Sequence, residues 1–83
     1  MDENLKPIEQ TESNRNLYNR LYGEYLRPIY RYLWERAGRS REIAEELAQE
    51  TFLRVWKQLP RLAKGSVILP AYLFRTAKNL LVS

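Results

Sequence analysis

The spacing of the apolar residues limits the possible folds of this chain more than any other feature of its sequence. In three separate segments, residues 14–37, 40–59 and 70–83, apolar side chains recur every three or four positions. Such a spacing places them on one face of an α-helix. Because short connections join the segments, the sequence predicts an all-α fold, a compact antiparallel three-helix bundle.

The first segment is predicted to be a helix that is interrupted once. Its apolar positions are Tyr18, Leu21, Tyr22, Tyr25, Ile29, Leu33 and Trp34. Pro28 lies among them, and proline lacks an amide hydrogen and clashes with the preceding turn, so we expect the helix to kink or split there. Gly38 fits the end of this helix, where a left-handed residue is needed.

The second segment carries the clearest helix signals. Ser40 is a suitable N-cap, and Pro60 is predicted to end the helix. Its inward stripe is expected to consist of Ile43, Leu47, Phe52, Val55, Trp56 and Leu59, with Ala44 and Ala48 at its narrow places. Residues 60–69 are predicted to form a loop. Val67, Ile68 and Leu69 make a short apolar run in it, for which a strand is the alternative, but nothing else in the chain could pair with such a strand.

The third segment is predicted to be a helix opened by Pro70, a residue suited to the first helical position. Its inward stripe is Leu73, Phe74, Ala77, Leu80 and Leu81. The helix reaches Ser83 without a cap, so residues 14–83 are expected to be one domain of a longer chain. The polar and charged residues 1–13 are predicted to form a flexible N-terminal tail.

The composition excludes several classes of function. The 83 residues include no cysteine and no histidine, which argues against disulfides, against the usual zinc sites and against the commonest general base. A phosphate-cradling glycine loop is also absent. Glu45 and Glu46 are adjacent and point in different directions on a helix, so they do not form a catalytic pair. We therefore expect no enzyme, no metal and no cofactor. No apolar run reaches the roughly 18 residues of a membrane span, so no membrane insertion and a cytoplasmic location are expected.

The charges are divided unevenly along the chain. All ten acidic residues lie between Asp2 and Glu50, whereas the segment from Thr51 to Ser83 has none. That segment carries six basic residues: Arg54, Lys57, Arg61, Lys64, Arg75 and Lys78. This asymmetry favours a polyanion such as nucleic acid as a partner of the C-terminal part. An ordinary solvated basic face is the alternative.

Three motifs in sequence order together resemble a known family. They are YLRPIYRY at residues 25–32, AEELAQETFLRVW at 44–56 and PAYLFRTAKNLL at 70–81. Over roughly residues 15–83 the chain resembles region two of the extracytoplasmic-function sigma factors. The resemblance implies a domain that binds the clamp helices of the largest subunit of RNA polymerase. It also implies recognition and melting of the minus-ten promoter element through its non-template strand. An anti-sigma factor is a further partner that the family implies.

The resemblance assigns residues to both surfaces. The polymerase-binding residues are predicted to be Glu46, Gln49, Glu50 and Arg54. The DNA-binding residues are predicted to be Arg61, Lys64, Ser66, Val67, Arg75, Lys78 and Asn79, of which Asn79 matches the family's Asn beside the pocket for a flipped base.

The chemistry of the residues agrees with this assignment. Glu42, Glu46 and Glu50 are four apart and line one helix face, where like charges weaken an isolated helix, so a basic partner that covers them is one interpretation. The alternative is an ordinary solvated face with Glu50 and Arg54 as an intrahelical pair. Lysine and arginine neutralise phosphates. Tyr72 is expected to pack in the core rather than to stack on a base. The alternative function is a helical adaptor module that binds proteins and no nucleic acid.

Overall fold

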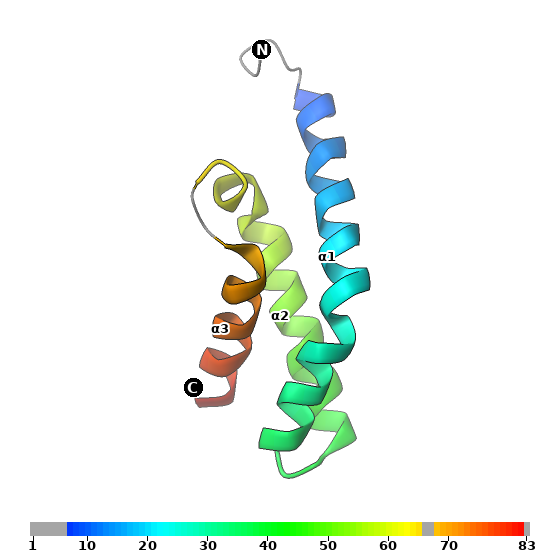
Figure 1. Ribbon diagram of the computed structural model, residues 1–83, viewed down its shortest axis with the longest axis vertical. Coiled ribbons are helices and arrows are strands. Elements are labelled where there is room, and N and C mark those ends of the chain that lie inside the picture. Colours follow the sequence, from blue (N-terminus) through cyan, green and yellow to red (C-terminus); the bar gives the residue numbers. More distant parts are fainter. Residues whose placement is uncertain (1–6, 66–67, 83) are drawn as a thin grey trace.

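The computed structural model describes residues 7–65 and 68–82 of the chain. Within them the chain forms three helices, α1 (Pro7–Arg36), α2 (Arg41–Leu62) and α3 (Leu69–Val82), and no strand. Figure 1 shows α2 running antiparallel to α1 and α3 reversing direction again beside α2. Each helix contacts both of the others. The predicted all-α three-helix bundle is therefore confirmed. None of the described helices combines the length and the apolarity that a membrane crossing requires.

The core is built from one apolar face of each helix. Its largest fully buried apolar side chains are Phe52, Ile29, Leu33, Leu59, Leu73 and Val55. Full burial of one such side chain stabilises the fold by about 1.5–3 kcal/mol. Ala44, Ala48 and Ala77 are also buried, and their small side chains allow the helices to approach closely. The core thus uses predicted apolar positions from all three segments.

The first helix differs from its prediction at its start and at Pro28. α1 begins at Pro7 rather than at residue 14, so residues 7–13 belong to the helix and not to a tail. Proline is tolerated in a first helical turn, because its missing amide hydrogen has no partner there. At Pro28 the sequence predicted a kink or a split. The split is wrong, because α1 continues through this residue. Leu21 on one side and Ile29 on the other are buried, so packing against the other helices supports both halves of α1.

The turn between α1 and α2 has two successive residues in the left-handed region, Gly38 (φ 67°) and Arg39 (φ 60°). The amide of Arg39 donates to the carbonyl of Trp34 at 2.9 Å, and its guanidinium lies 5.5 Å from the centre of the Trp34 ring. These contacts hold a non-glycine residue in a conformation that side chains usually avoid. Ser40 follows as the predicted N-cap, and its hydroxyl oxygen accepts from the amide of Ile43 at 3.2 Å.

Replacing Ser40 with alanine is expected to lower the free energy of unfolding by about 1 kcal/mol, because the amide of Ile43 loses its acceptor. Urea unfolding followed by circular dichroism measures this difference. Ser13→Ala is the matched control, since Ser13 is an exposed serine within α1. Equal stabilities for the Ser40 variant and the wild type would show that the cap does not hold α2.

The second helix does not end at Pro60, as its prediction had it, but at Leu62. Leu59 and Leu62 are buried, and the amide of Ala63 donates to the carbonyl of Leu59 at 2.8 Å. The last turn is therefore held by packing and by its own hydrogen bonds, although the ring of Pro60 removes one donor.

The third helix begins one residue early, at Leu69, which leaves Pro70 within its first turn. The amide of Tyr72 donates to the carbonyl of Ile68 at 3.0 Å, and Ile68 is 71% exposed. Of the apolar run, Val67 lies outside the described residues, and neither Ile68 nor Leu69 forms a strand.

Two positions of the predicted inward stripe of α2 are not inward. Ile43 is 47% exposed and Trp56 is 37% exposed, so the prediction was wrong for the first and only partly right for the second. Thr51 and Thr76 are buried instead. Their hydroxyls donate to the carbonyls four residues earlier, at 2.7 and 2.8 Å, so burial leaves neither hydroxyl unpaired. Tyr72 packs against the core, as expected.

Candidate functional site

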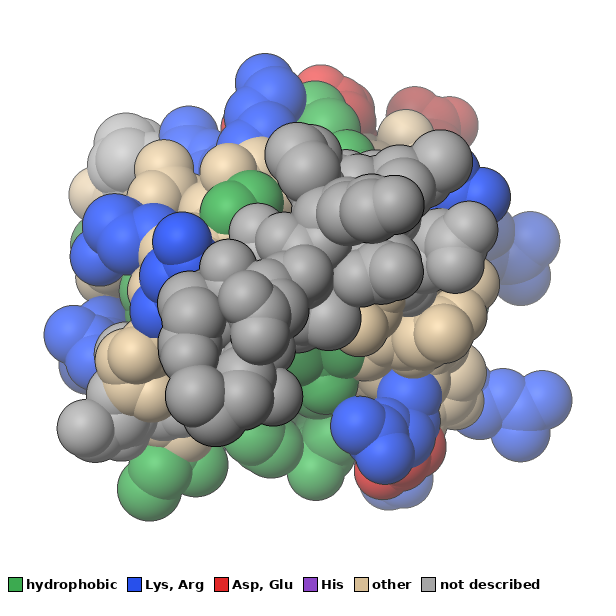
Figure 2. Space-filling view, turned by 90° about the horizontal axis from the view of Figure 1, so that it is seen from above, with side chains coloured by type: hydrophobic (Ala, Val, Ile, Leu, Met, Phe, Trp, Pro, Cys, Tyr) green, Lys and Arg blue, Asp and Glu red, His purple; other side chains and the backbone are tan. Residues whose placement is uncertain are grey.

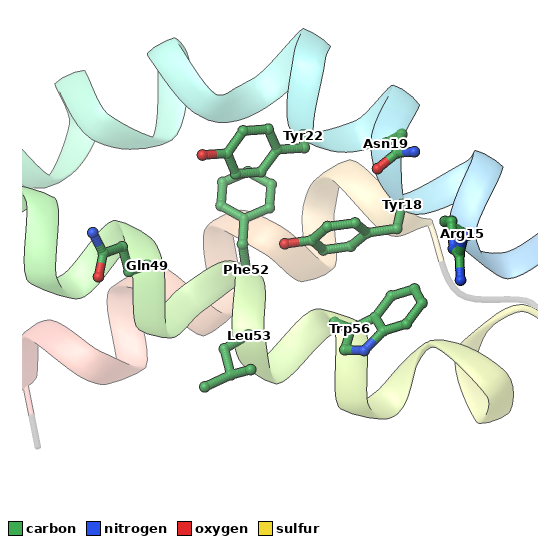
Figure 3. A pocket seen from close by; sticks show the side chains of 8 residues that line it. All are labelled: Arg15, Tyr18, Asn19, Tyr22, Gln49, Phe52, Leu53 and Trp56. Atoms are coloured by element: carbon green, nitrogen blue, oxygen red, sulfur yellow. The ribbon is translucent and has the colours of Figure 1, made fainter.

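Two grooves lie along α2, one on each side of its exposed face. The first lies between α1 and α2 and consists of two neighbouring cavities of about 470 and 540 Å³. Figure 3 shows the first cavity, which is lined by Arg15, Tyr18, Asn19, Tyr22, Gln49, Phe52, Leu53 and Trp56. The second is lined by Tyr22, Leu26, Arg27, Tyr30, Arg31, Glu45, Ala48 and Gln49. Because Tyr22 and Gln49 line both, the two cavities form one continuous surface, named here the α1–α2 groove.

Aromatic rings form the wall of the α1–α2 groove at its Trp56 end. The ring of Tyr18 lies 5.1 Å from that of Trp56, and the ring of Tyr22 lies 5.0 Å from that of Phe52, both nearly edge to face. Figure 3 shows the Tyr18 side chain projecting from α1 towards α2, between Phe52 and Trp56. Burial, and secondarily the neighbouring Tyr22, raises the pKa of Tyr18 above its ordinary value. Aromatic rings therefore form much of this end of the groove, together with the polar side chains of Arg15 and Asn19.

An acidic stripe, Glu42, Glu46 and Glu50, runs along α2 beside this groove. The first two side chains are exposed and the third is half-buried. Glu50 forms an ion pair with Arg54, in which the Nε of Arg54 lies 3.0 Å from Oε2 of Glu50. Gln49 lies next to the stripe and lines the groove. The exposed carboxylates of the stripe suit basic side chains of a partner, and the aromatic wall suits its apolar side chains, while Arg15, Arg27 and Arg31 of the groove would meet acidic or polar groups.

The second groove lies between α2 and α3 and is more polar. Its cavity of about 380 Å³ is lined by Arg54, Lys57, Gln58, Tyr72, Thr76 and Asn79. Two of these side chains are cationic, one amide comes from each helix, and no acidic side chain lines the cavity. This surface, named here the α2–α3 groove, combines donors for phosphate oxygens with amides that can read the edge of a base.

All six basic side chains of the C-terminal part are exposed. Arg54 and Lys57 line the α2–α3 groove, and Arg61 donates to Oε1 of Gln58 at 3.1 Å. Lys64 lies in the turn after α2, and Arg75 and Lys78 lie on α3. Figure 2 views the molecule from the end that carries the α2–α3 connection, and Lys and Arg side chains lie at several places around this end.

The structure places some of the predicted residues in or beside the two grooves. Glu46, Gln49 and Glu50 lie close together on α2. Of the residues predicted to bind DNA, Asn79 lines the α2–α3 groove, while Arg61, Lys64, Arg75 and Lys78 are exposed but line neither groove. Arg54 was assigned to the polymerase-binding set, but it lines the α2–α3 groove. Ser66 and Val67, assigned to the DNA-binding set, lie outside the described residues.

Sequence reasoning missed several residues that line the grooves. Leu53 and Trp56 follow Gln49 by four and seven positions, so helical spacing could have placed them on the same face. Trp56 was instead counted with the core. Lys57 and Gln58 were not assigned to a surface, because only the packing of α3 against α2 brings them beside Asn79.

The chain matches one protein family and one characterised relative. The family model of sigma-70 region 2 matches residues 21–83. Over 77 residues the chain is 34% identical to the ECF RNA polymerase sigma factor BldN of Streptomyces coelicolor. This match covers 92% of the chain and 29% of that relative, so the chain spans less than a third of the relative's length. No solved structure gives a significant match.

Proposed function

Because the chain belongs to the sigma-70 region 2 family, we propose that it binds RNA polymerase and recognises and melts the minus-ten promoter element. Family membership also answers the question of catalysis, since the chain is not an enzyme. In this proposal the polymerase carries out the chemistry and the chain supplies the specificity for the promoter.

The observation that carries the proposal is the chemical difference between the two grooves of α2. On one side lie the acidic stripe and the α1–α2 groove, whose lining combines aromatic rings with Glu45 and three arginines, Arg15, Arg27 and Arg31. On the other side lies the α2–α3 groove, whose lining combines Arg54 and Lys57 with two amides and holds no carboxylate. A chain that binds a protein and a nucleic acid at the same time needs both kinds of surface.

The polymerase-facing surface comprises Glu46, Gln49 and the α1–α2 groove. The clamp helices that the family resemblance implies would place apolar side chains against Tyr22 and Trp56. Their basic side chains would approach the acidic stripe. Charges on such a rim contribute mainly to the rate of association and to orientation, while the buried aromatic contacts contribute most of the affinity.

The DNA-facing surface comprises the α2–α3 groove and the exposed lysine and arginine side chains of the C-terminal part. Lys57 and Arg54 would neutralise phosphates of the single non-template strand. Asn79 carries a donor and an acceptor for the edge of an unpaired base. Opening the duplex costs a few kcal/mol per flipped base, and capture of that base in a pocket offsets part of this cost.

Two further points belong to the same proposal. An anti-sigma factor would inhibit the chain by covering the α1–α2 groove or the α2–α3 groove. A protein with this function acts where the promoter is, which in a bacterium is the cytoplasm.

Replacing Glu46 and Gln49 with alanine is expected to weaken binding to the polymerase core at least ten-fold. In the proposal both side chains make polar contacts with the partner, and the loss of two such contacts worth about 1 kcal/mol each amounts to more than ten-fold. The Glu50–Arg54 pair stays intact in this variant, so the DNA-facing groove is unchanged. Binding is measured by titrating labelled chain with core enzyme.

The control for this variant is Glu24→Ala with Asn16→Ala, which also removes one acid and one amide. Glu24 and Asn16 are exposed on α1 and line neither groove. This control is expected to bind within about two-fold of the wild type, since surface changes away from a hot spot cost little. Equal affinities for the Glu46 and Gln49 variant and the wild type would place the polymerase elsewhere.

The second candidate function is an adaptor that binds only proteins. The observation that favours it is the α1–α2 groove, whose exposed aromatic wall would suit a protein partner without any DNA. Titration with a single-stranded oligonucleotide at two salt concentrations separates the candidates. Phosphate contacts give an affinity that falls steeply with salt. The adaptor gives no binding, with or without the polymerase core.

A further inference from the structure

One ion pair connects the two surfaces of α2. Glu50 belongs to the acidic stripe, one helical turn after Glu46, and its carboxylate holds the guanidinium of Arg54 at 3.0 Å. Arg54 in turn lines the α2–α3 groove with Lys57 and Asn79. Both side chains of the pair are about half exposed, 43% for Glu50 and 52% for Arg54, so a ligand can reach either one.

We propose that Glu50 withholds the charge of Arg54 from nucleic acid and that a basic partner on Glu50 releases it. This inference rests on the proposed function, because it assumes a nucleic-acid strand in the α2–α3 groove and a basic protein on the acidic stripe. It makes Arg54 a phosphate-binding residue of the groove and Glu50 the residue that controls it.

The electrostatics of the pair give the reason. A carboxylate 3.0 Å from the Nε of Arg54 cancels most of the attraction of that guanidinium for a phosphate. The same carboxylate also repels a phosphate that approaches the groove. A lysine or arginine of a partner that binds the acidic stripe competes with Arg54 for the oxygens of Glu50. Once that partner neutralises Glu50, Arg54 can turn its donors to the strand.

Thermodynamic linkage makes the effect reciprocal. If a partner on the acidic stripe increases the affinity for the strand, the strand increases the affinity for the partner by the same factor. An exposed ion pair of this kind sets a factor of up to about five-fold. The two surfaces would then favour each other's ligands without any movement of the helices.

The test is the affinity of the 83-residue chain for a single-stranded oligodeoxynucleotide, measured by fluorescence anisotropy over a range of salt concentrations. Glu50→Gln is expected to bind about two- to five-fold more tightly than the wild type. Its plot of log affinity against log salt should be steeper by about 0.7, the contribution of one more neutralised phosphate. Glu46→Gln is the matched control, because it removes the same charge one turn away and leaves the pair intact.

Arg54→Gln completes the experiment. This variant is expected to bind the oligonucleotide more weakly than the wild type. When Glu50→Gln is added to Arg54→Gln, the affinity should rise no more than when Glu46→Gln is added. Equal effects of the two glutamate changes in the presence of Arg54 would overturn the inference. So would weaker binding by Glu50→Gln, which would mean that Glu50 positions Arg54 for the strand. In both cases salt-dependent binding by the wild type would leave the proposed function standing. Absence of binding by every variant at low salt would overturn both.

Discussion

Replacing Phe52 with alanine is expected to cost about 3–5 kcal/mol of stability and to unfold much of the population at 37 °C. Phe52 is 1% exposed, and its ring lies 6.3 Å from that of Tyr18 and 5.0 Å from that of Tyr22. The change therefore removes burial, leaves a cavity and deprives both tyrosines of an edge-to-face partner. A chain of this length has a total stability of roughly 4–12 kcal/mol, at 0.05–0.15 kcal/mol per residue.

Thermal unfolding followed by circular dichroism measures this effect. A loss of 3 kcal/mol lowers the melting temperature of so small a domain by about 12–24 °C. Two controls define the cause. Phe52→Leu keeps most of the volume and should lose clearly less, and Leu53→Ala changes the neighbouring residue, which is 43% exposed. A Phe52→Ala variant that melts with the wild type would show that the contact between α1 and α2 is not centred on this ring.

Replacing Lys57 and Asn79 with alanine is expected to weaken promoter binding about ten- to one-hundred-fold while leaving binding to the polymerase unchanged. One phosphate contact and one hydrogen-bonded contact to the edge of an unpaired base are lost together, and a base-edge contact is worth about 1–3 kcal/mol. Both residues line the α2–α3 groove and neither lies in the α1–α2 groove. The measurement is the affinity of chain plus core enzyme for a promoter fragment whose minus-ten non-template strand is single.

The matched control removes one basic side chain and one side-chain amide from α1, outside both grooves. Arg20 and Asn16 are exposed on α1 and line neither groove, so Arg20→Ala with Asn16→Ala should bind within about two-fold of the wild type. A loss of polymerase binding by the Lys57 and Asn79 variant would mean that the two surfaces are not separate. Unchanged promoter binding by the Lys57 and Asn79 variant would show that the α2–α3 groove does not bind the DNA strand.

The helices were predictable from the sequence because burial of an apolar face decides their existence, whereas local signals do not decide where they end. Pro28 and Pro60 each carry a strong helix-breaking signal, yet α1 and α2 continue through them. Buried leucines and isoleucine on both sides, such as Leu59 and Leu62 around Pro60, outweigh one missing hydrogen bond. Ile43 shows a different error: its spacing fits the inward stripe of α2, but its side chain is 47% exposed.

The two surfaces were predictable in part, and the missing part depends on how the helices pack. Glu46 and Gln49 lie one turn apart, so their common surface follows from helical spacing alone. The α2–α3 groove does not follow from spacing, because it combines residues that are far apart in the sequence. Arg54 was assigned to the polymerase-binding set through the family resemblance, and only the position of α3 shows that it lines the α2–α3 groove.

The central claim is that α2 carries a polymerase-binding surface on one side and a strand-binding surface on the other. One ¹⁵N-labelled sample tests it most directly, because the side-chain amides of Gln49 and Asn79 report on the two grooves in a single NMR spectrum. Titration with a single-stranded minus-ten oligonucleotide is expected to shift the Asn79 signals and to leave those of Gln49 in place, and a clamp-helix fragment is expected to do the reverse. If the oligonucleotide shifts the signals of Gln49 and leaves Asn79 unchanged, the account is contradicted.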